Sequence, residues 1–141
     1  MRNAAQTQPD MKAKMLYKIL IVDDSKLARM AVVKALNALR PDWTRIEAAS
    51  AEEALSAMRT SAPDLALLDF NMPGRDGLDL AAELRRSNPA MPVGVVSANH
   101  QQAVVDRALA IGASFLPKPL NEQLLAGFIV EAEKRLAKDG R

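Results

Sequence analysis

Residues 65–77 read LALLDFNMPGRDG and carry the strongest local signal for the fold. The run from Leu65 to Leu68 is apolar at every position, which is typical of a strand buried on both faces of a parallel sheet. The run is followed at once by an acidic residue, Asp69, and Pro73-Gly74 then marks a turn. We therefore expect a buried strand that delivers one carboxylate to the edge of a sheet.

Short apolar runs of this kind recur along the chain, and stretches with helical spacing separate them. The five runs are Ile19–Val22, Arg45–Ala48, Leu65–Leu68, Val93–Val96 and Phe115–Leu116. Ser50 with Glu53 forms a capping box at the start of the second helix, and Asn121 caps the last helix. This alternation predicts an α/β fold in which helices cover both faces of a parallel sheet.

Length and composition fit one globular domain, because 141 residues with 49% hydrophobic side chains suffice for a single core. We predict a flexible N-terminal extension at residues 1–16, a domain at residues 17–136 and a tail at residues 137–141. The chain has no cysteine, no secretion signal and no apolar run of the roughly 18 residues that span a membrane. We therefore expect a soluble, cytoplasmic protein with no membrane partner.

The net charge of +2 does not indicate a nucleic-acid partner. Residues 1–16 contribute +2 and residues 137–141 contribute +1, which leaves −1 for the body of the chain. A near-neutral body with 4% aromatic residues and no basic stripe predicts no direct binding to nucleic acid.

Polar side chains follow four of the five predicted strands. The first strand is followed by Asp23-Asp24, the third by Asp69, the fourth by Ser97 and the fifth by Lys118-Pro119. In open parallel sheets, ligands bind beyond the carboxyl ends of the strands, where the strand order reverses. The second strand ends in Ala-Ala-Ser at residues 48–50, which offers no obvious chemistry. We therefore place the second strand at one edge, as in the order 2-1-3-4-5.

The acidic residues and Lys118 suffice for one reaction. Carboxylates 4 Å apart repel each other by roughly 4 kcal/mol per pair at an effective dielectric constant of 20. A divalent cation would relieve this repulsion, and oxygen ligands suit Mg²⁺. Asp69 is then placed to act as a carboxylate nucleophile that forms an acyl phosphate. Lys118 and Ser97 would contact the other phosphoryl oxygens, and no separate general base is required.

These motifs together resemble the signature of bacterial response regulator receiver domains, the CheY-like superfamily of two-component signalling. The matching pieces are Asp23-Asp24, LLDFNMPGRDG at residues 67–77, Ser97-Ala98 and Lys118-Pro119. The resemblance spans residues 17 to about 136 and implies a flavodoxin-like, doubly wound (βα)5 fold. It also implies a phosphoacceptor that catalyses its own phosphorylation and dephosphorylation rather than an enzyme with a separate substrate.

The resemblance also assigns roles to single residues. It implies that Asp23, Asp24, Asp69 and the backbone carbonyl of Asn71 hold Mg²⁺. It implies that a histidine kinase or a histidine phosphotransfer protein phosphorylates Asp69, and that Lys118 pairs with the phosphate. Two further residues, Ser97 and Phe115, would move together as the switch that a downstream protein target reads.

The segment around the switch differs from most members of that family. Many relatives have tyrosine at the position of Phe115, so the ring here has no hydroxyl, and its movement would depend on packing alone. The segment Gly-Ala-Ser-Phe at residues 112–115 is one residue shorter than is usual. This segment also lacks the acidic residues that DNA-binding relatives use in their activated dimer, so we do not predict that dimer. In relatives the bond corresponding to Lys118-Pro119 is often cis.

The first helix, at residues 26–39, has two apolar stripes. We expect one stripe to face the sheet, and it consists of Ala28, Ala31, Val32, Ala35 and Leu39. The other stripe consists of Leu27, Met30 and Val33. We predict that this second stripe is where the phosphodonor protein docks, because it lies beside the predicted site. The alternative is that neighbouring loops cover these side chains.

Several alternatives remain open at this point. An aspartyl phosphohydrolase would typically have a second carboxylate two residues after its nucleophile, where this chain has Asn71. The chain is also open to interpretation as a pseudo-receiver, or as a receiver fragment whose output domain is missing, although we expect a stand-alone regulator. Asp23 or Asp24 taken alone would be a helix N-cap. We interpret His100 as a solvated or capping side chain, not as a phosphohistidine.

Overall fold

The computed structural model describes residues 16–138 of the chain. Its five parallel strands form one sheet in the order β2-β1-β3-β4-β5, so the predicted fold class and strand order are confirmed. The strands are β1 (Lys18–Val22), β2 (Thr44–Ala48), β3 (Leu65–Asp69), β4 (Val93–Ser97) and β5 (Ser114–Pro117). The helices are α2 (Lys26–Leu39), α3 (Ala51–Ser61), α4 (Gly77–Ser87), α5 (Gln102–Ala110) and α6 (Glu122–Lys138).

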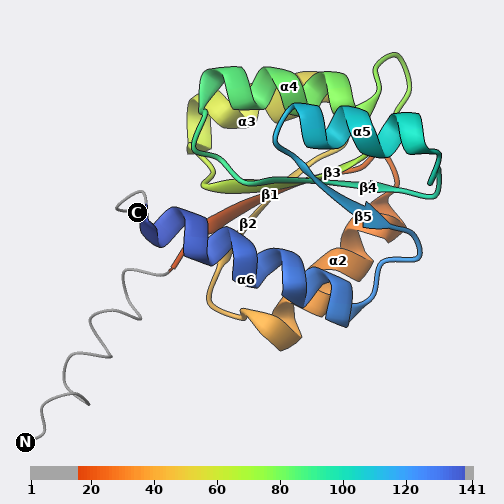
Figure 1. Ribbon diagram of the computed structural model, residues 1–141. Helices are drawn as coiled ribbons and strands as arrows, with labels where there is room; N and C mark the ends of the chain where they lie inside the picture. Colours follow the sequence, from red (N-terminus) through yellow and green to blue (C-terminus); the bar gives the residue numbers. More distant parts are fainter. Residues whose placement is uncertain (1–15, 139–141) are drawn as a thin grey trace, which may run out of the picture.

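The sheet lies between two layers of helices. Helices α2 and α6 cover one face, and α3, α4 and α5 cover the other (Figure 1). Strands β3 and β4 are buried at every position, whereas the edge strands β2 and β5 are partly exposed. Two separate apolar clusters, one on each face, form the core. This burial on both faces explains why the strands are apolar without alternation.

Side chains that cap the helices fix where α3 and α6 begin. The hydroxyl of Ser50 accepts a hydrogen bond from the backbone N–H of Glu53 (3.1 Å), and the Glu53 carboxylate accepts one from Ala49 (2.8 Å). At α6, the side-chain oxygen of Asn121 accepts from Leu124 N–H (2.8 Å). The predicted capping box and the predicted Asn121 cap are therefore confirmed.

The predicted stripe of helix α2 is confirmed in part, because Val32, Ala35 and Leu39 pack against the core cluster on the α2 side. The fully buried side chain of α2 is Leu36, which lay outside the stripe that we expected to face the sheet. Ala31 was predicted to be buried and is exposed, so that part of the prediction is wrong. Leu36 belongs to the core cluster on the α6 side of the sheet, and a larger apolar side chain gains more from burial than an alanine.

The described residues include all of the predicted domain at residues 17–136 and part of each flanking segment. Residues 1–15 of the predicted extension and residues 139–141 of the predicted tail lie outside the described residues. Helix α6 continues through Ala137 and Lys138, so the first two residues of the predicted tail are helical. Within residues 16–138, no helix is both long enough and apolar enough to cross a membrane.

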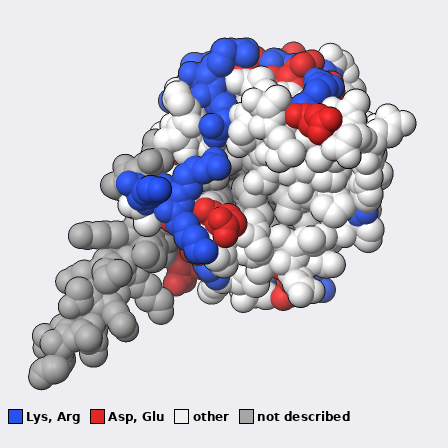
Figure 2. All heavy atoms as spheres, in the orientation of Figure 1, with Lys and Arg blue, Asp and Glu red and all other residues white. Residues whose placement is uncertain are grey.

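Basic side chains gather where α4 and α6 end. The last turn of α4 carries Arg85 and Arg86, and the last turn of α6 carries Arg135 and Lys138. Figure 2 shows Lys and Arg concentrated at this end of the molecule and a largely uncharged surface elsewhere on the visible face. Cations at helix C-termini offset the negative end of the helix dipole, so this grouping has a local structural cause.

Gly77 lets α4 begin directly against the end of β3. A Cβ atom at this position would collide with the backbone carbonyl oxygen of Asp69 and lie 2.9 Å from the Cα of Phe70. The Gly77 N–H also donates to the carbonyl of Phe70 (2.8 Å). Any side chain here would therefore displace the backbone of Asp69.

We predict that Gly77→Ala destabilises the protein by about 1–3 kcal/mol, the typical cost of overpacking a buried position. Gly127→Ala is the matched control, because Gly127 lies inside α6 with nothing within 4 Å of its Cβ position. Alanine should stabilise that helix by roughly 0.5–1 kcal/mol. Urea unfolding measures both changes. Equal stability of the two variants would contradict the close approach at Gly77.

Candidate functional site: an acidic pocket with a lysine

Three carboxylates meet at the carboxyl ends of β1 and β3. The two strands are neighbours, with Val22 opposite Leu68, so Asp23 and Asp24 after β1 come close to Asp69 at the end of β3. Each of the three offers an oxygen atom, and these oxygens lie within 4.8 Å of one another. The Asp69 side chain is buried, Asp23 is half-buried and Asp24 is exposed.

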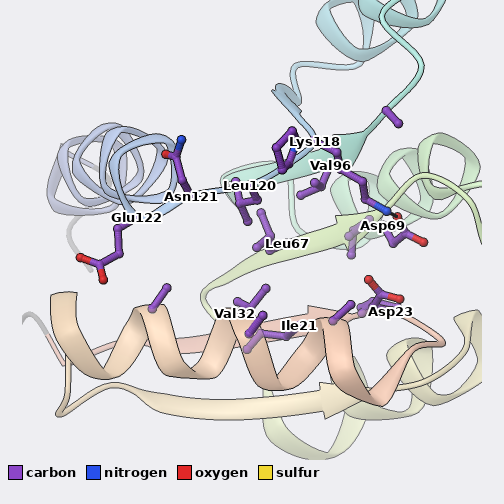
Figure 3. A pocket seen from close by; sticks show the side chains of 17 residues that line it. Ile21, Asp23, Val32, Leu67, Asp69, Val96, Lys118, Leu120, Asn121 and Glu122 are labelled. Carbon is purple, nitrogen blue, oxygen red and sulfur yellow. Dashed lines mark ion pairs between the residues drawn. The ribbon is translucent and has the colours of Figure 1, made fainter.

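Lys118 is the cation that faces Asp69. Its Nζ lies 2.7 Å from Asp69 Oδ1 (Figure 3), and this buried oxygen has no other polar partner among the described residues. Lys118 follows β5, and its backbone N–H donates to the carbonyl of Ser97 (3.0 Å). The Lys118-Pro119 peptide bond is cis. The loop after β5 therefore brings one positive charge over the end of β3.

The electrostatics of Asp23 reflect this crowding. Burial raises the pKa of the Asp23 carboxyl group above its ordinary value, and a hydrogen bond from the Ser25 N–H (2.9 Å) opposes this effect. The charges of Asp69 and Asp24 raise the Asp23 pKa further, whereas Lys118 lowers it. The net direction is upward, so a negative charge on Asp23 is unfavourable in this pocket unless a cation compensates it.

Neither Asp23 nor Asp24 caps α2. The N-cap is Ser25, whose hydroxyl accepts a hydrogen bond from the Ala28 N–H (3.2 Å). The Asp23 carboxylate accepts from Ser25 instead and so braces the turn that leads into the helix. The N-cap interpretation of the acidic pair is therefore wrong, and both carboxylates have an oxygen close to Asp69.

Ser97 and Phe115 lie beside the acidic pocket on β4 and β5. Ser97 is 1% exposed, and its hydroxyl oxygen accepts a hydrogen bond from the Asn99 N–H (2.9 Å). Phe115 is partly buried and packs against the core cluster on the α3, α4 and α5 side. Ser97 and Phe115 thus sit on adjacent strands, where Val95 pairs with Phe115.

Three contributors to this region were missed by the sequence analysis. Arg29 on α2 donates from Nη1 to the backbone carbonyl of Asp23 (2.6 Å) and pairs through Nε with Glu47 (3.0 Å). Gly77 allows the close approach described above, and the ring of His100 contacts that of Phe115. Arg29 could have been found from the sequence, because it is a basic residue between the apolar residues Ala28 and Met30 of the first helix. The His100 contact leaves no local signal, because it joins residues 15 positions apart.

A pocket of 560 Å³ extends from Asp69 between α2 and the start of α6. Its mouth carries Asp23, Asp69 and Lys118, and its apolar wall includes the small residues Ala28, Ala31 and Ala35 of α2. Figure 3 shows Val32 and Ile21 facing Leu67 and Leu120 across it. Most of the helix stripe that we predicted to pack on the sheet therefore lines an open groove.

The other predicted residues have mixed positions. Leu27 and Met30 are 77% and 53% exposed, so neighbouring loops do not cover them. Val33 is half-buried and packs against the core cluster on the α2 side, so it contributes less surface than predicted. Asn71 is exposed in the loop two residues beyond Asp69.

The donor set of the pocket fits a hard divalent cation. All candidate ligand atoms are carboxylate oxygens, and oxygen-only sites suit Mg²⁺ and Ca²⁺ rather than softer metals. Lys118 is the one cation beside these three carboxylates among the described residues, and burial and the neighbouring carboxylates raise the pKa of Asp23, so the cluster keeps an excess of negative charge. The residues therefore fit a metal of this class.

The chain belongs to the response regulator receiver domain family. Residues 19–129 match the sequence profile of that domain, which is most of the chain and includes every residue of the pocket. The family explains the strand order and the placement of the acidic residues together. It also confirms the resemblance that the sequence motifs indicated.

Individual relatives agree with this assignment. The glycerol metabolism activator of Pseudomonas putida is 40% identical over 99 residues, which cover 70% of this chain and 45% of that protein. A CheY-like receiver domain protein from Methanospirillum hungatei has a TM-score of 0.77 and 27% identity, and the match covers 88% of this chain and 98% of that one. The chain thus spans less than half the length of the Pseudomonas protein.

A third relative comes from a complex that contains BeF3 and Mg²⁺. A chain in the crystal structure of the CheX-CheY-BeF3-Mg²⁺ complex from Borrelia burgdorferi has a TM-score of 0.74 and 25% identity. The match covers 82% of this chain and 87% of that one.

We predict that Asp23→Asn stabilises the protein in metal-free buffer and removes the stabilisation that Mg²⁺ gives to the wild type. The gain should be roughly 1 kcal/mol, the repulsion of two carboxylates about 4 Å apart in full solvent screening. Asparagine keeps an oxygen that accepts from Ser25, so the turn should survive. Thermal unfolding with and without Mg²⁺ measures both effects, and a less stable metal-free variant would contradict the electrostatic interpretation.

Proposed function

We propose that this chain accepts a phosphoryl group on Asp69 and signals through the change in its surface that follows. The observation that carries the proposal is the buried Asp69 carboxylate, with Lys118 at 2.7 Å and two further carboxylates beside it. A carboxylate at the end of a central strand, open to a pocket, is placed for in-line attack on phosphorus. From the same residues we also propose that the chain is a phosphoacceptor rather than an enzyme with a separate substrate.

We propose Mg²⁺ as the cofactor. Asp23, Asp24 and Asp69 would hold it, together with the backbone carbonyl of Asn71. When bound, the ion supplies charge neutralisation for the phosphoryl oxygens and for the crowded carboxylates. The Borrelia relative was crystallised in a complex that contains Mg²⁺ and BeF3, which supports the choice of this ion.

The chain's own residues have distinct tasks in the proposed transfer. An oxygen of Asp69 forms a bond to phosphorus while the bond from phosphorus to the donor's leaving group breaks. Lys118 leaves its ion pair with Asp69 and pairs with a phosphoryl oxygen, which keeps its charge compensated throughout. Ser97 would give up its contact with Asn99 and donate its hydroxyl to another phosphoryl oxygen.

The proposed switch consists of Ser97 and Phe115. Movement of Ser97 toward the phosphoryl group would free space beside β5 and let the Phe115 ring pack further inward. The hydroxyl of Ser97 already lies at the end of β4 next to the pocket, and Phe115 lies on the neighbouring strand. A downstream protein target would read this change, while direct nucleic-acid and membrane binding are not part of the proposal. A cytoplasmic location stays a prediction.

We propose that a histidine kinase or a histidine phosphotransfer protein is the donor and that it docks on α2. The exposed side chains of Leu27 and Met30 form an apolar surface on the helix that also lines the Asp69 pocket. A partner that presents a phosphohistidine to Asp69 would lie over this surface at the same time. Val33 is half-buried, so only the exposed part of its side chain would contact the docked partner.

Two other functions have less support. A phosphohydrolase would need a general acid near Asp69, and position 71 is an asparagine in an exposed loop. The proposal that the chain is a receiver fragment of a longer regulator agrees with its match to 45% of the Pseudomonas relative. That proposal concerns only how the signal is passed on by an output domain, and it leaves the chemistry at Asp69 unchanged.

We predict that a small phosphodonor such as acetyl phosphate adds one phosphoryl group to the wild type in the presence of Mg²⁺ and none to Asp69→Asn. Asparagine lacks the nucleophilic carboxylate but keeps the size of the side chain. Intact-mass spectrometry after incubation measures the label. Labelling of the variant at the wild-type level would exclude Asp69 as the acceptor.

We predict that Met30→Glu slows phosphorylation by the cognate donor protein at least tenfold, about 1.4 kcal/mol, because it places a charge in an apolar contact. Labelling by acetyl phosphate should stay normal, since that reaction needs only the pocket. Leu109→Glu is the matched control, because Leu109 is an equally exposed apolar residue on α5, on the other face of the sheet. Equal slowing of both reactions by Met30→Glu would show a structural role for α2 instead.

A further inference from the structure

The ring of Phe115 has an aromatic neighbour in the loop that follows β4. The ring centroids of His100 and Phe115 are 5.7 Å apart, and the planes are perpendicular. His100 is exposed, and Phe115 is half-buried. This edge-to-face geometry is favourable for aromatic pairs. Because phenylalanine has no hydroxyl, the Phe115 ring has no polar group to anchor it, and its position depends on its packing against the core cluster and on contacts such as this one.

Hydrogen bonds link His100 to the end of β4. The Ser97 hydroxyl oxygen accepts from the N–H of Asn99 (2.9 Å), and the Asn99 side-chain oxygen accepts from the N–H of Gln101 (3.0 Å). His100 lies between these two bonded residues, so the backbone on either side of it is held in place. The backbone that carries His100 is therefore linked to the Ser97 hydroxyl through Asn99.

We infer that His100 is a positioning residue that holds the Phe115 ring in its resting orientation and couples that ring to Ser97. This inference rests on the proposed phosphorylation of Asp69. When the Ser97 hydroxyl turns to a phosphoryl oxygen, the Asn99 N–H loses its acceptor and the loop at residues 98–101 is free to move. His100 then leaves Phe115, and the ring is released to pack inward.

The contact belongs to the resting state in this scheme, so removing it favours the activated state. His100→Ala should raise the fraction of molecules in the activated conformation by roughly two- to tenfold, the range that corresponds to one aromatic pair. The apparent affinity for a ligand that binds only this conformation rises by the same factor, as long as the conformation is a minor one.

The experiment uses beryllium fluoride with saturating Mg²⁺ as a probe of the activated conformation, and backbone amide NMR signals report binding. His100→Ala should bind the probe about two- to tenfold more tightly than the wild type, and acetyl phosphate should label it faster by a similar factor. His100→Phe keeps a ring at the position and should return both values toward those of the wild type. Gln101→Ala, in the same loop, is the control and should change neither.

A double-mutant cycle separates positioning from a general effect on the loop. If His100 acts through Phe115, then adding His100→Ala to Phe115→Leu should have no further effect on probe affinity. A full effect in the Phe115→Leu background, or weaker binding by His100→Ala alone, would overturn the inference. Failure of the wild type to take any label on Asp69 would overturn the proposed function instead, so the two outcomes are distinct.

Discussion

The structure depends on a concentration of negative charge that the strand order creates. Because β1 and β3 are neighbours, the carboxylates of Asp23, Asp24 and Asp69 lie close together at one edge of the sheet. The Asp69 side chain is also buried. Lys118 reaches this cluster from beyond β5, by way of a backbone hydrogen bond to the end of β4. One lysine cannot neutralise three carboxylates. The pocket therefore favours binding of a second cation. A phosphoryl group added to Asp69 would also need partners, and the two nearby candidates, Lys118 and Ser97, already contact Asp69 and Asn99.

The position of α2 connects the pocket to its surroundings. At their far ends α2 and α6 are held together by the bidentate ion pair of Arg40 and Glu133, with both contacts at 2.8 Å. The Glu133 hydrogen bond raises the pKa of Arg40, as expected for such a pair. At the end near Asp69 the helix has alanines facing α6, and the groove stays open. The proposed docking surface and the acidic pocket therefore lie on the same helix, so a change in α2 packing would affect both.

The strands and the acidic pocket were predictable from the sequence because their signals are local. Continuous apolar runs indicate buried parallel strands, and the residue after each run must lie at the same edge of the sheet. The orientation of α2 was not predictable in this way. Several faces of that helix are apolar, and the choice of Leu36 over Ala31 depends on the shape of the core that α6 provides. The contact between His100 and Phe115 likewise depends on the path of a loop.

The energetics of the proposed switch at Ser97 and Phe115 depend on which bonds exist before phosphorylation. Moving a two-state equilibrium from 1:99 to 99:1 takes about 5.5 kcal/mol of differential interaction, and a hydrogen bond to a charged group contributes roughly 1.5–3 kcal/mol. Lys118 is already paired with Asp69, and the Ser97 hydroxyl already donates to the Asn99 carbonyl at 3.5 Å, so both groups would exchange one partner for another. The net driving force is smaller than the sum of the new bonds. A full switch therefore requires two conformations of similar free energy, and a contact as modest as one aromatic pair then has a large effect on their populations.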